Sequence, residues 1–199
     1  MTKSEPRLLT LRYWIGSTWM KLWGWKFEGN FPAQGKFVLI VAPHTSGWDF
    51  PHMIAVMFWL RTQVSWLGKH TLFQPPFGRL LRGLGGVPVD RRSSHGLVEQ
   101  IAELFSQQDN LIIGMAPEST RVRTDSWKSG FYHIACRAQV PILPCYIDYP
   151  QKQVGLGPAL CPSGNVVQDM GTLRTFYQNF RGANPDQESV IVLKEEQSG

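Results

Sequence analysis

Short apolar runs alternate with amphipathic segments along most of the chain. The runs are rich in β-branched and aromatic residues, as buried strands are, and they span residues 37–41, 63–67, 111–115 and 140–147. Between them, apolar residues that recur every three or four positions predict helices over residues 47–60, 94–108 and 130–139. This alternation predicts an α/β layered domain with a mostly parallel central sheet flanked by helices.

Shorter segments complete the predicted order. They are a helix over residues 78–84, a brief strand within 85–92, a strand over 153–157, a helix over 169–180 and a strand over 189–193. The prolines within 140–147 predict that this strand lies at an edge or begins irregularly. No linker interrupts the pattern, so we expect residues 1–199 to form a single domain.

The N-terminal segment, within residues 1–30, is predicted to form an amphipathic helix. Between residues 7 and 25, basic residues are interspersed with apolar residues that recur at helical spacing. These apolar residues are Leu8, Leu11, Ile15, Trp19 and Leu22. Two interpretations are open at this point. The helix either packs on the core, or it lies in a membrane interface or lines a lipid entrance.

Composition and charge narrow the classes of partner. The net charge of +5 is compatible with a membrane surface, a nucleic acid or an anionic substrate. The chain has neither a long Lys/Arg block nor a zinc-finger or RNP-like pattern, which argues against nucleic-acid binding. The three cysteines form no C-x-x-C pair, which is typical of a reducing compartment.

Neither a secretory signal nor an apolar window of the roughly 18 to 20 residues that span a bilayer is recognisable in the sequence. We therefore expect a cytoplasmic protein that is soluble or peripheral on the inner face of the membrane.

A histidine and a carboxylate stand five positions apart where the first apolar run ends. Pro43 ends the predicted strand, and Ser46 or Gly47 can cap the helix that follows. His44 and Asp49 therefore lie on a strand-to-helix turn, where open α/β sheets usually bind their ligands. A histidine that a carboxylate holds in one tautomer is a general base for a hydroxyl or a water.

Two more predicted strands are followed by polar side chains. Arg91 and Arg92 follow the brief strand within 85–92, and Glu118 and Arg121 follow the run at 111–115. If these strands are parallel neighbours, the polar side chains converge with His44 at one edge of the sheet. Because guanidinium groups bind phosphate oxygens well, the combination predicts activation of a hydroxyl on a phosphorylated molecule.

Other interpretations of the same residues are open. A histidine before a helix is often only a structural hydrogen-bonding group, and loop arginines are often only solvated. Ser46 could be a nucleophile beside His44, although the G-x-S-x-G pattern of serine hydrolases is missing. His44, Asp49 and His52 could ligate a metal, although their spacing is not H-E-x-x-H.

Four short blocks occur in a fixed order along the chain: H-x4-D at 44–49, G-x-x-P-V-D-R at 85–91, E-S-T-R at 118–121 and V-P-I-L-P at 140–144. Their order and separation resemble the glycerolipid acyltransferase family, which includes the 1-acylglycerol-3-phosphate acyltransferases, and within it the small bacterial members. The resemblance extends over residues 37–147, more than half of the chain. It implies a catalytic core over residues 37–150.

The resemblance also implies roles for individual residues. The first block supplies the catalytic base, His44, and its acidic partner, Asp49. The next two blocks bind the glycerol phosphate, and the fourth shapes the acyl site. The residues implicated in substrate binding are Gly86, Arg91, Glu118, Thr120 and Arg121, and those of the acyl site are Val140, Pro141 and Pro144.

The implied reaction is acyl transfer from acyl-CoA or acyl-carrier protein to a lysophosphatidic-acid-like acceptor, with the membrane surface as a partner and with neither a metal nor another cofactor. Ser119 departs from the family pattern, which has glycine at this position of the third block, and Pro88 replaces a bulky apolar residue. The Ser119 side chain leaves open another lysolipid as acceptor, such as a lyso-aminolipid or another lysophospholipid. A lipid-phosphate-binding protein without turnover is the alternative of a different class.

Overall fold

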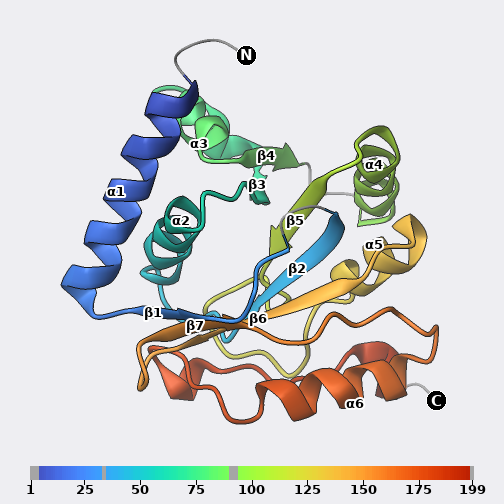
Figure 1. The fold of residues 1–199 in the computed structure, drawn as a ribbon. Helices are drawn as coiled ribbons and strands as arrows, with labels where there is room; N and C mark the ends of the chain where they lie inside the picture. Colours follow the sequence, from blue (N-terminus) through green and yellow to red (C-terminus); the bar gives the residue numbers. More distant parts are fainter. Residues whose placement is uncertain (1–4, 33–34, 90–93, 198–199) are drawn as a thin grey trace.

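A seven-stranded sheet forms the centre of the computed structural model, which describes residues 5–32, 35–89 and 94–197 (Figure 1). The strands lie in the order β1-β7-β6-β2-β5-β3-β4. Their bounds are β1 Lys26–Glu28, β2 Lys36–Ala42, β3 Ser65–Lys69, β4 Gly86–Val89, β5 Leu111–Met115, β6 Ile142–Asp148 and β7 Gln153–Leu156. Every pair is parallel except β6 with β7.

Helices cover both faces of this sheet (Figure 1). One face carries α1 (Glu5–Trp23) and α2 (Asp49–Trp59), and the other carries α4 (Ser94–Gln107), α5 (Gly130–Ala138) and α6 (Val166–Tyr177). The connection from β3 to β4 holds a 3₁₀ turn and a short helix, and two 3₁₀ turns follow α6. These are η1 His70–Phe73, α3 Gly78–Gly83, η2 Pro185–Gln187 and η3 Lys194–Gln197.

The structure confirms the predicted fold class, a mostly parallel sheet flanked by helices with a helix at the N-terminus. The apolar run at 111–115 has the same bounds as β5. Helices α3, α4 and α5 begin and end within two residues of their predicted bounds. Strand β3 begins two residues later than predicted, and α6 begins three residues earlier. Pattern and composition were thus sufficient wherever a segment was long and strongly periodic.

Two short segments were predicted incorrectly. Residues 189–193 do not form a strand, and Leu193 makes only an isolated bridge to Trp127. Leu193 is buried because it packs into the cluster under α6, so its hydrophobicity serves packing and not a sheet. Conversely, β1 was missed, because its three residues, Lys-Phe-Glu, offer too little apolar pattern to predict a strand.

The prolines of β6 do not place it at an edge, because β6 pairs with β2 on one side and with β7 on the other. The Pro144 carbonyl accepts a hydrogen bond from Gly157 N at 2.8 Å. A strand residue presents its N–H and C=O to the same side, so the N–H that Pro144 lacks would face β7. Pro144 lies one residue beyond the last pair of those two strands, Cys145 with Leu156, so the missing N–H falls at the end of the ladder and does not interrupt it.

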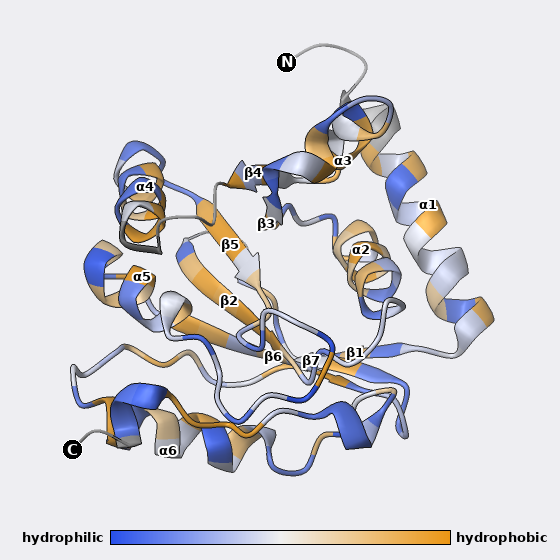
Figure 2. Ribbon diagram, turned by 180° about the vertical axis from the view of Figure 1, so that it is seen from behind, coloured by the Kyte–Doolittle hydropathy of each residue, from blue (hydrophilic) through white to orange (hydrophobic). Residues whose placement is uncertain are grey.

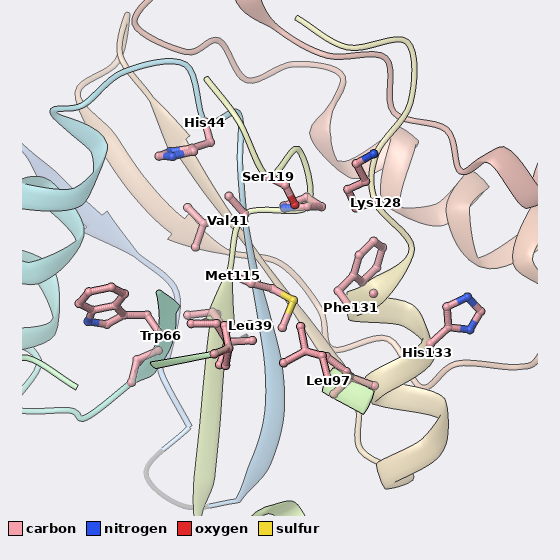
Figure 3. A pocket seen from close by; sticks show the side chains of 18 of the residues that line it. Leu39, Val41, His44, Trp66, Leu97, Met115, Ser119, Lys128, Phe131 and His133 are labelled. Carbon is pink, nitrogen blue, oxygen red and sulfur yellow. The ribbon is translucent and has the colours of Figure 1, made fainter. Parts of the chain in front are cut away.

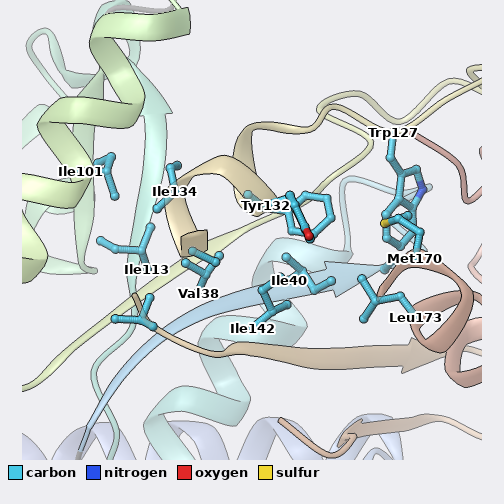
Figure 4. Close-up of a cluster of buried hydrophobic side chains, with 14 of the residues drawn as sticks. Val38, Ile40, Ile101, Ile113, Trp127, Tyr132, Ile134, Ile142, Met170 and Leu173 are labelled. Atoms are coloured by element: carbon cyan, nitrogen blue, oxygen red, sulfur yellow. The ribbon is translucent and has the colours of Figure 1, made fainter. Parts of the chain in front are cut away.

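Strand β2 distributes its side chains between two apolar clusters. Val38, Ile40 and Ala42 pack with α4, α5 and α6, whereas Leu39 and Val41 pack on the side of α1 and α2. The central strands are the hydrophobic part of the sheet (Figure 2), and the larger cluster gathers around Val38 and Ile40 (Figure 4). A strand buried on both faces explains why its sequence reads as an unbroken apolar run.

Helix α1 packs on α2 through a different face from the one that its apolar stripe predicts. Among the described side chains of α1, the buried residues that face α2 are Gly16, Ser17 and Met20, whereas Leu11 is 57% and Leu22 79% exposed. Of the stripe, Trp19 contacts α2 through His52, but most of its described residues lie outside the packed face. Within residues 5–32, 35–89 and 94–197, no helix has both the length and the hydrophobicity needed to cross a bilayer.

The close approach of α1 to α2 predicts that Gly16 cannot carry a side chain. A Cβ at Gly16 would lie 2.5 Å from the carbonyl oxygen of Ala55 and 2.7 Å from the amide nitrogen of Trp59. We expect Gly16→Ala to lower the free energy of unfolding by about 1–3 kcal/mol, measured by chemical denaturation.

Gly171→Ala is the matched control, because Gly171 also lies in a helix and a Cβ there would meet nothing within 4 Å. It should stabilise the protein by up to about 1 kcal/mol. A Gly16→Ala variant as stable as Gly171→Ala would contradict the packing described here.

Candidate active site

The turn between β2 and α2 is closed by its own polar groups. The Ser46 hydroxyl accepts a hydrogen bond from Trp48 N at 3.2 Å, and Oδ2 of Asp49 accepts one from Ser46 N at 3.0 Å. Trp48 occupies the N-cap position of α2 and makes no side-chain cap. Ser46 therefore shapes the turn instead of capping the helix.

The imidazole of His44 and the carboxylate of Asp49 are in direct contact within this turn. Nδ1 of His44 lies 2.9 Å from Oδ2 of Asp49, and the two side chains are 26% and 2% exposed. Because Nδ1 faces the carboxylate, Nε2 is the nitrogen that can exchange a proton with a substrate. This is the arrangement that a general base and its orienting partner require.

Tyr149 makes a further contact with the same carboxylate that sequence reasoning did not predict. Its hydroxyl donates to Oδ1 of Asp49 at 2.6 Å. Tyr149 directly follows β6, and β6 is a parallel neighbour of β2. The signal that could have found it is this position, because the carboxyl ends of neighbouring parallel strands meet at one edge of the sheet.

Glu118 lies beneath the same turn and binds its backbone. Oε2 of Glu118 accepts a hydrogen bond from His44 N at 2.7 Å, and Glu118 is only 3% exposed. Burial raises the pKa of Glu118 to about 8, against the partly opposing effect of the hydrogen bond from His44. The structure thus brings the first and third blocks together, with Glu118 holding the backbone of His44.

The rest of the third block lies beside the first block and the cavity. Ser119 adopts a left-handed backbone conformation, with φ of 59°, which favours glycine, and it lines the cavity described below. The hydroxyl of Thr120 accepts a hydrogen bond from Val122 N at 3.3 Å. Arg121 is exposed, and its Nη1 lies 3.0 Å from the point where a Cβ on Gly47 would stand.

Only residues 85–89 of the second block are among the residues that the structure describes. Arg91 and Arg92 lie outside the described residues. Gly86 is buried at the start of β4, where a Cβ would lie 2.6 Å from the Phe73 ring and 2.7 Å from the carbonyl oxygen of Leu81. Packing therefore accounts for this glycine, and it is Val89, at the other end of β4, that lines the cavity.

The fourth block lies in the sheet and not in the wall of the cavity. Val140 is buried with the larger cluster, Pro141 precedes β6, and Pro144 pairs with Ile40 of β2. None of Val140, Pro141 and Pro144 is among the residues that line the cavity.

A cavity of about 1300 Å³ opens beside His44 (Figure 3). This volume exceeds the roughly 300–1,000 Å³ of most small-molecule pockets. Apolar side chains from both faces of the sheet dominate its lining, among them Leu39, Met53, Met57, Leu97, Met115, Phe131 and Ile134. Polar residues stand at its margins: Ser119, Lys128 and His133 (Figure 3). The cavity is thus suited to a long apolar chain that ends at His44.

His52 does not join His44 and Asp49 in a common ligand set. Its Nδ1 accepts a hydrogen bond from Trp19 Nε1 at 3.0 Å, and its ring lies 4.3 Å from the Trp25 ring. Burial lowers the pKa of His52, which keeps the imidazole neutral. In the part of the chain that the structure describes, no three His, Cys, Asp or Glu side chains are grouped to hold a metal ion.

The comparison with protein-family models decides the family. The model named Acyltransferase matches residues 25–148, which is more than half of the chain and includes all the blocks. The chain belongs to this acyltransferase family. A likeness in fold agrees with it: the crystal structure of the 1-acyl-sn-glycerophosphate (LPA) acyltransferase from Thermotoga maritima superimposes with a TM-score of 0.57 at 18% identity. That match covers 89% of this chain and 79% of the other.

Relatives of similar sequence carry one name, 1-acyl-sn-glycerol-3-phosphate acyltransferase. The protein from Haemophilus influenzae is 29% identical over 153 residues, which cover 72% of this chain and 62% of the relative. That from Escherichia coli is 27% identical over 145 residues, which cover 68% and 58%. The chain thus spans about three fifths of the length of these acyltransferases.

The raised pKa of Glu118 predicts a pH-dependent stability. Between the ordinary value of 4.5 and about 8, the folded protein keeps a proton that the unfolded chain releases. The contribution of Glu118 to stability is therefore complete below pH 4.5 and is lost as the pH rises to about 8, with a slope of up to about 1.4 kcal/mol per pH unit. Glu118→Gln keeps an acceptor for His44 N and should remove this slope in urea titrations between pH 5 and 8.

Glu103→Gln, which changes an exposed carboxylate of α4, is the control and should keep the slope of the wild type. Equal slopes for wild type and Glu118→Gln would show that Glu118 is ionised in the folded protein at neutral pH.

Proposed function

We propose that this acyltransferase moves a fatty acyl group from a thioester, acyl-CoA or acyl-carrier protein, to the free hydroxyl of a lysophosphatidic-acid-like acceptor in phospholipid biosynthesis. One observation carries the proposal: the contact between His44 and Asp49 lies at a large, mainly apolar cavity. A general base beside space for an acyl chain suits the acylation of a hydroxyl and needs no further cofactor.

The proposed mechanism is direct transfer. Nε2 of His44 takes the proton of the acceptor hydroxyl, and the oxygen attacks the thioester carbonyl carbon. The carbon–sulfur bond then breaks, and the thiolate receives the proton from the imidazolium. Asp49 orients the ring and stabilises its positive charge while it holds the proton. Such base assistance is typically worth about 10²- to 10⁴-fold in rate.

Basic residues support a phosphorylated acceptor. Arg121 lies against the turn that carries His44, and Lys128 stands at the margin of the cavity. Arg91 and Thr120 join them in the proposal on the strength of the block pattern alone. A guanidinium group beside this turn can bind a phosphate on the same molecule whose hydroxyl His44 activates.

Ser119 favours one alternative acceptor. Its side chain lines the cavity where the family pattern has glycine, and it adds a hydroxyl beside Arg121. Another lysolipid with a larger or more polar head group is therefore the second candidate. A binding protein without turnover is the weaker candidate, because the His44–Asp49 contact that the proposed catalysis requires is intact.

We also propose that α1 places the enzyme on the inner face of the membrane. Leu11, Trp14 and Leu22 are more than half exposed along this helix, and Phe77 and Leu80 are equally exposed near its N-terminal half. The two groups are joined where Arg12 of α1 donates to the carbonyl oxygen of Gly83. Apolar and aromatic side chains beside basic ones are typical of helices that lie in a bilayer interface.

His44→Ala tests the proposed base. Loss of the imidazole should lower the rate of thiol release from acyl-CoA with lysophosphatidic acid by at least about 100-fold, while circular dichroism stays unchanged. His70→Ala is the matched control, because His70 is exposed on η1 outside the cavity. If His44→Ala keeps the activity of His70→Ala, then His44 is not the base.

A paired substitution tests the membrane surface. Trp14→Ser with Leu22→Ser removes two exposed apolar side chains, so the fold should persist while co-sedimentation with anionic liposomes falls by at least about ten-fold. Val122→Ser with Val167→Ser is the control, because both valines are exposed away from α1. Equal sedimentation of the two variants would contradict a membrane role for α1.

A further inference from the structure

The carboxylate of Asp49 has a contact that the mechanism above leaves unused. Oδ2 faces Nδ1 of His44 and accepts from Ser46 N, and Oδ1 accepts from the hydroxyl of Tyr149 at 2.6 Å. The side chain of Asp49 is only 2% exposed, so bulk water does not satisfy these oxygens. Tyr149 therefore satisfies the second oxygen of this buried carboxylate.

Tyr149 is itself fixed on several sides. Its amide donates to the carbonyl oxygen of Arg181 at 3.0 Å, at the tight turn between β6 and β7. Its ring stands edge-on to the Trp25 ring, with 5.0 Å between centroids and 90° between planes, and Trp25 is buried. A side chain anchored in this way holds its hydroxyl in one place, which a positioning contact requires.

Trp25 links this arrangement to the N-terminal helix. Its ring lies 4.3 Å from the His52 ring, and His52 accepts a hydrogen bond from Trp19 of α1. The ring of Tyr149 therefore packs against the same aromatic group that docks α1 on α2. The ring of Tyr149 is therefore held from the side of that docking, while its hydroxyl reaches the turn that carries His44.

We propose that Tyr149 is a positioning residue of the reaction, which holds Asp49 so that its Oδ2 stays aligned with Nδ1 of His44 while the imidazole carries the substrate proton. The inference rests on the proposed function. Without the hydroxyl, Oδ1 is left buried and unsatisfied, and the carboxylate can rotate to recover a partner at the expense of its contact with His44.

The hydroxyl keeps its proton throughout the usual pH range. Burial, together with the neighbouring carboxylate of Asp49, raises the pKa of Tyr149 well above its ordinary value. Tyr149 is therefore a permanent donor to Asp49 and does not exchange protons with the substrate.

Tyr149→Phe removes the donor and keeps the ring. We expect kcat to fall about ten-fold, with KM for the thioester and for the lysolipid unchanged, because the residue acts on Asp49 and not on either substrate. Tyr146→Phe is the matched control. Tyr146 lies on β6, three residues before Tyr149, and likewise donates to a carboxylate, Oε2 of Glu28 at 2.8 Å, outside the cavity. This control should keep kcat.

A second readout does not depend on turnover. In protein labelled with ¹⁵N-histidine, the Nδ1 proton resonance of His44, identified by its loss in His44→Ala, should shift in Tyr149→Phe and stay in place in Tyr146→Phe. An unchanged kcat together with an unshifted resonance would overturn the inference. If the wild type transfers no acyl group, the proposed function fails, and the resonance alone then decides whether Tyr149 positions the pair.

Discussion

The parallel pairing of β2 with β5 on one side and with β6 on the other is the constraint on which the site depends. Because the three strands run in one direction, their carboxyl ends open at one edge of the sheet. His44 follows β2 by two residues, Glu118 follows β5 by three, and Tyr149 follows β6 by one. Each contributes a hydrogen bond or a direct side-chain contact to the turn that ends at Asp49.

The two carboxyl groups buried near the His44 imidazole, those of Asp49 and Glu118, differ in their hydrogen-bond partners. Asp49 accepts hydrogen bonds from Ser46 N and from the Tyr149 hydroxyl, and it contacts the His44 imidazole. Glu118 accepts a hydrogen bond from His44 N. Burial, and to a smaller extent the charge of Asp49, raises the pKa of Glu118 to about 8, so that this group is mostly neutral at pH 7. For a second carboxylate charge buried at this site, the desolvation penalty would exceed the favourable electrostatic energy. The raised pKa of Glu118 thus avoids a second buried carboxylate charge beside the base.

The sequence was sufficient for the longer elements and for the residues that share a local pattern, but not for β1 or for residues 189–193. β2, β5 and the helices between strands follow from apolar runs and helical periodicity, and His44 and Asp49 follow from their place on one turn. Convergence of His44 with Glu118 was predicted by assuming that the strands are parallel neighbours, and β2 and β5 are. The assignment of catalytic and binding roles to these residues stays a prediction.

What the sequence could not supply depends on tertiary contacts. Tyr149 is 100 positions from Asp49 in the sequence and contacts it through its hydroxyl group. No local sequence pattern identifies a tyrosine that acts through one such hydrogen bond. The apolar periodicity of α1 indicated a stripe but not which face would pack, because Gly16 permits a closer approach to α2 than the large side chains do. The block pattern assigns Gly86 to substrate binding, which stays a prediction, whereas its crowding by Phe73 could be seen only in the structure.

The account is tested most directly by identifying the lipid that the protein makes. The protein would be incubated with isotope-labelled acyl-CoA or acyl-carrier protein and an equimolar mixture of lysophosphatidic acid, lysophosphatidylethanolamine and lysophosphatidylcholine. The products would then be identified by mass spectrometry. The account predicts labelled phosphatidic acid as the main product, with one thiol released for each ester formed. Label in no lysolipid, or only in acceptors without a terminal phosphate, would contradict it.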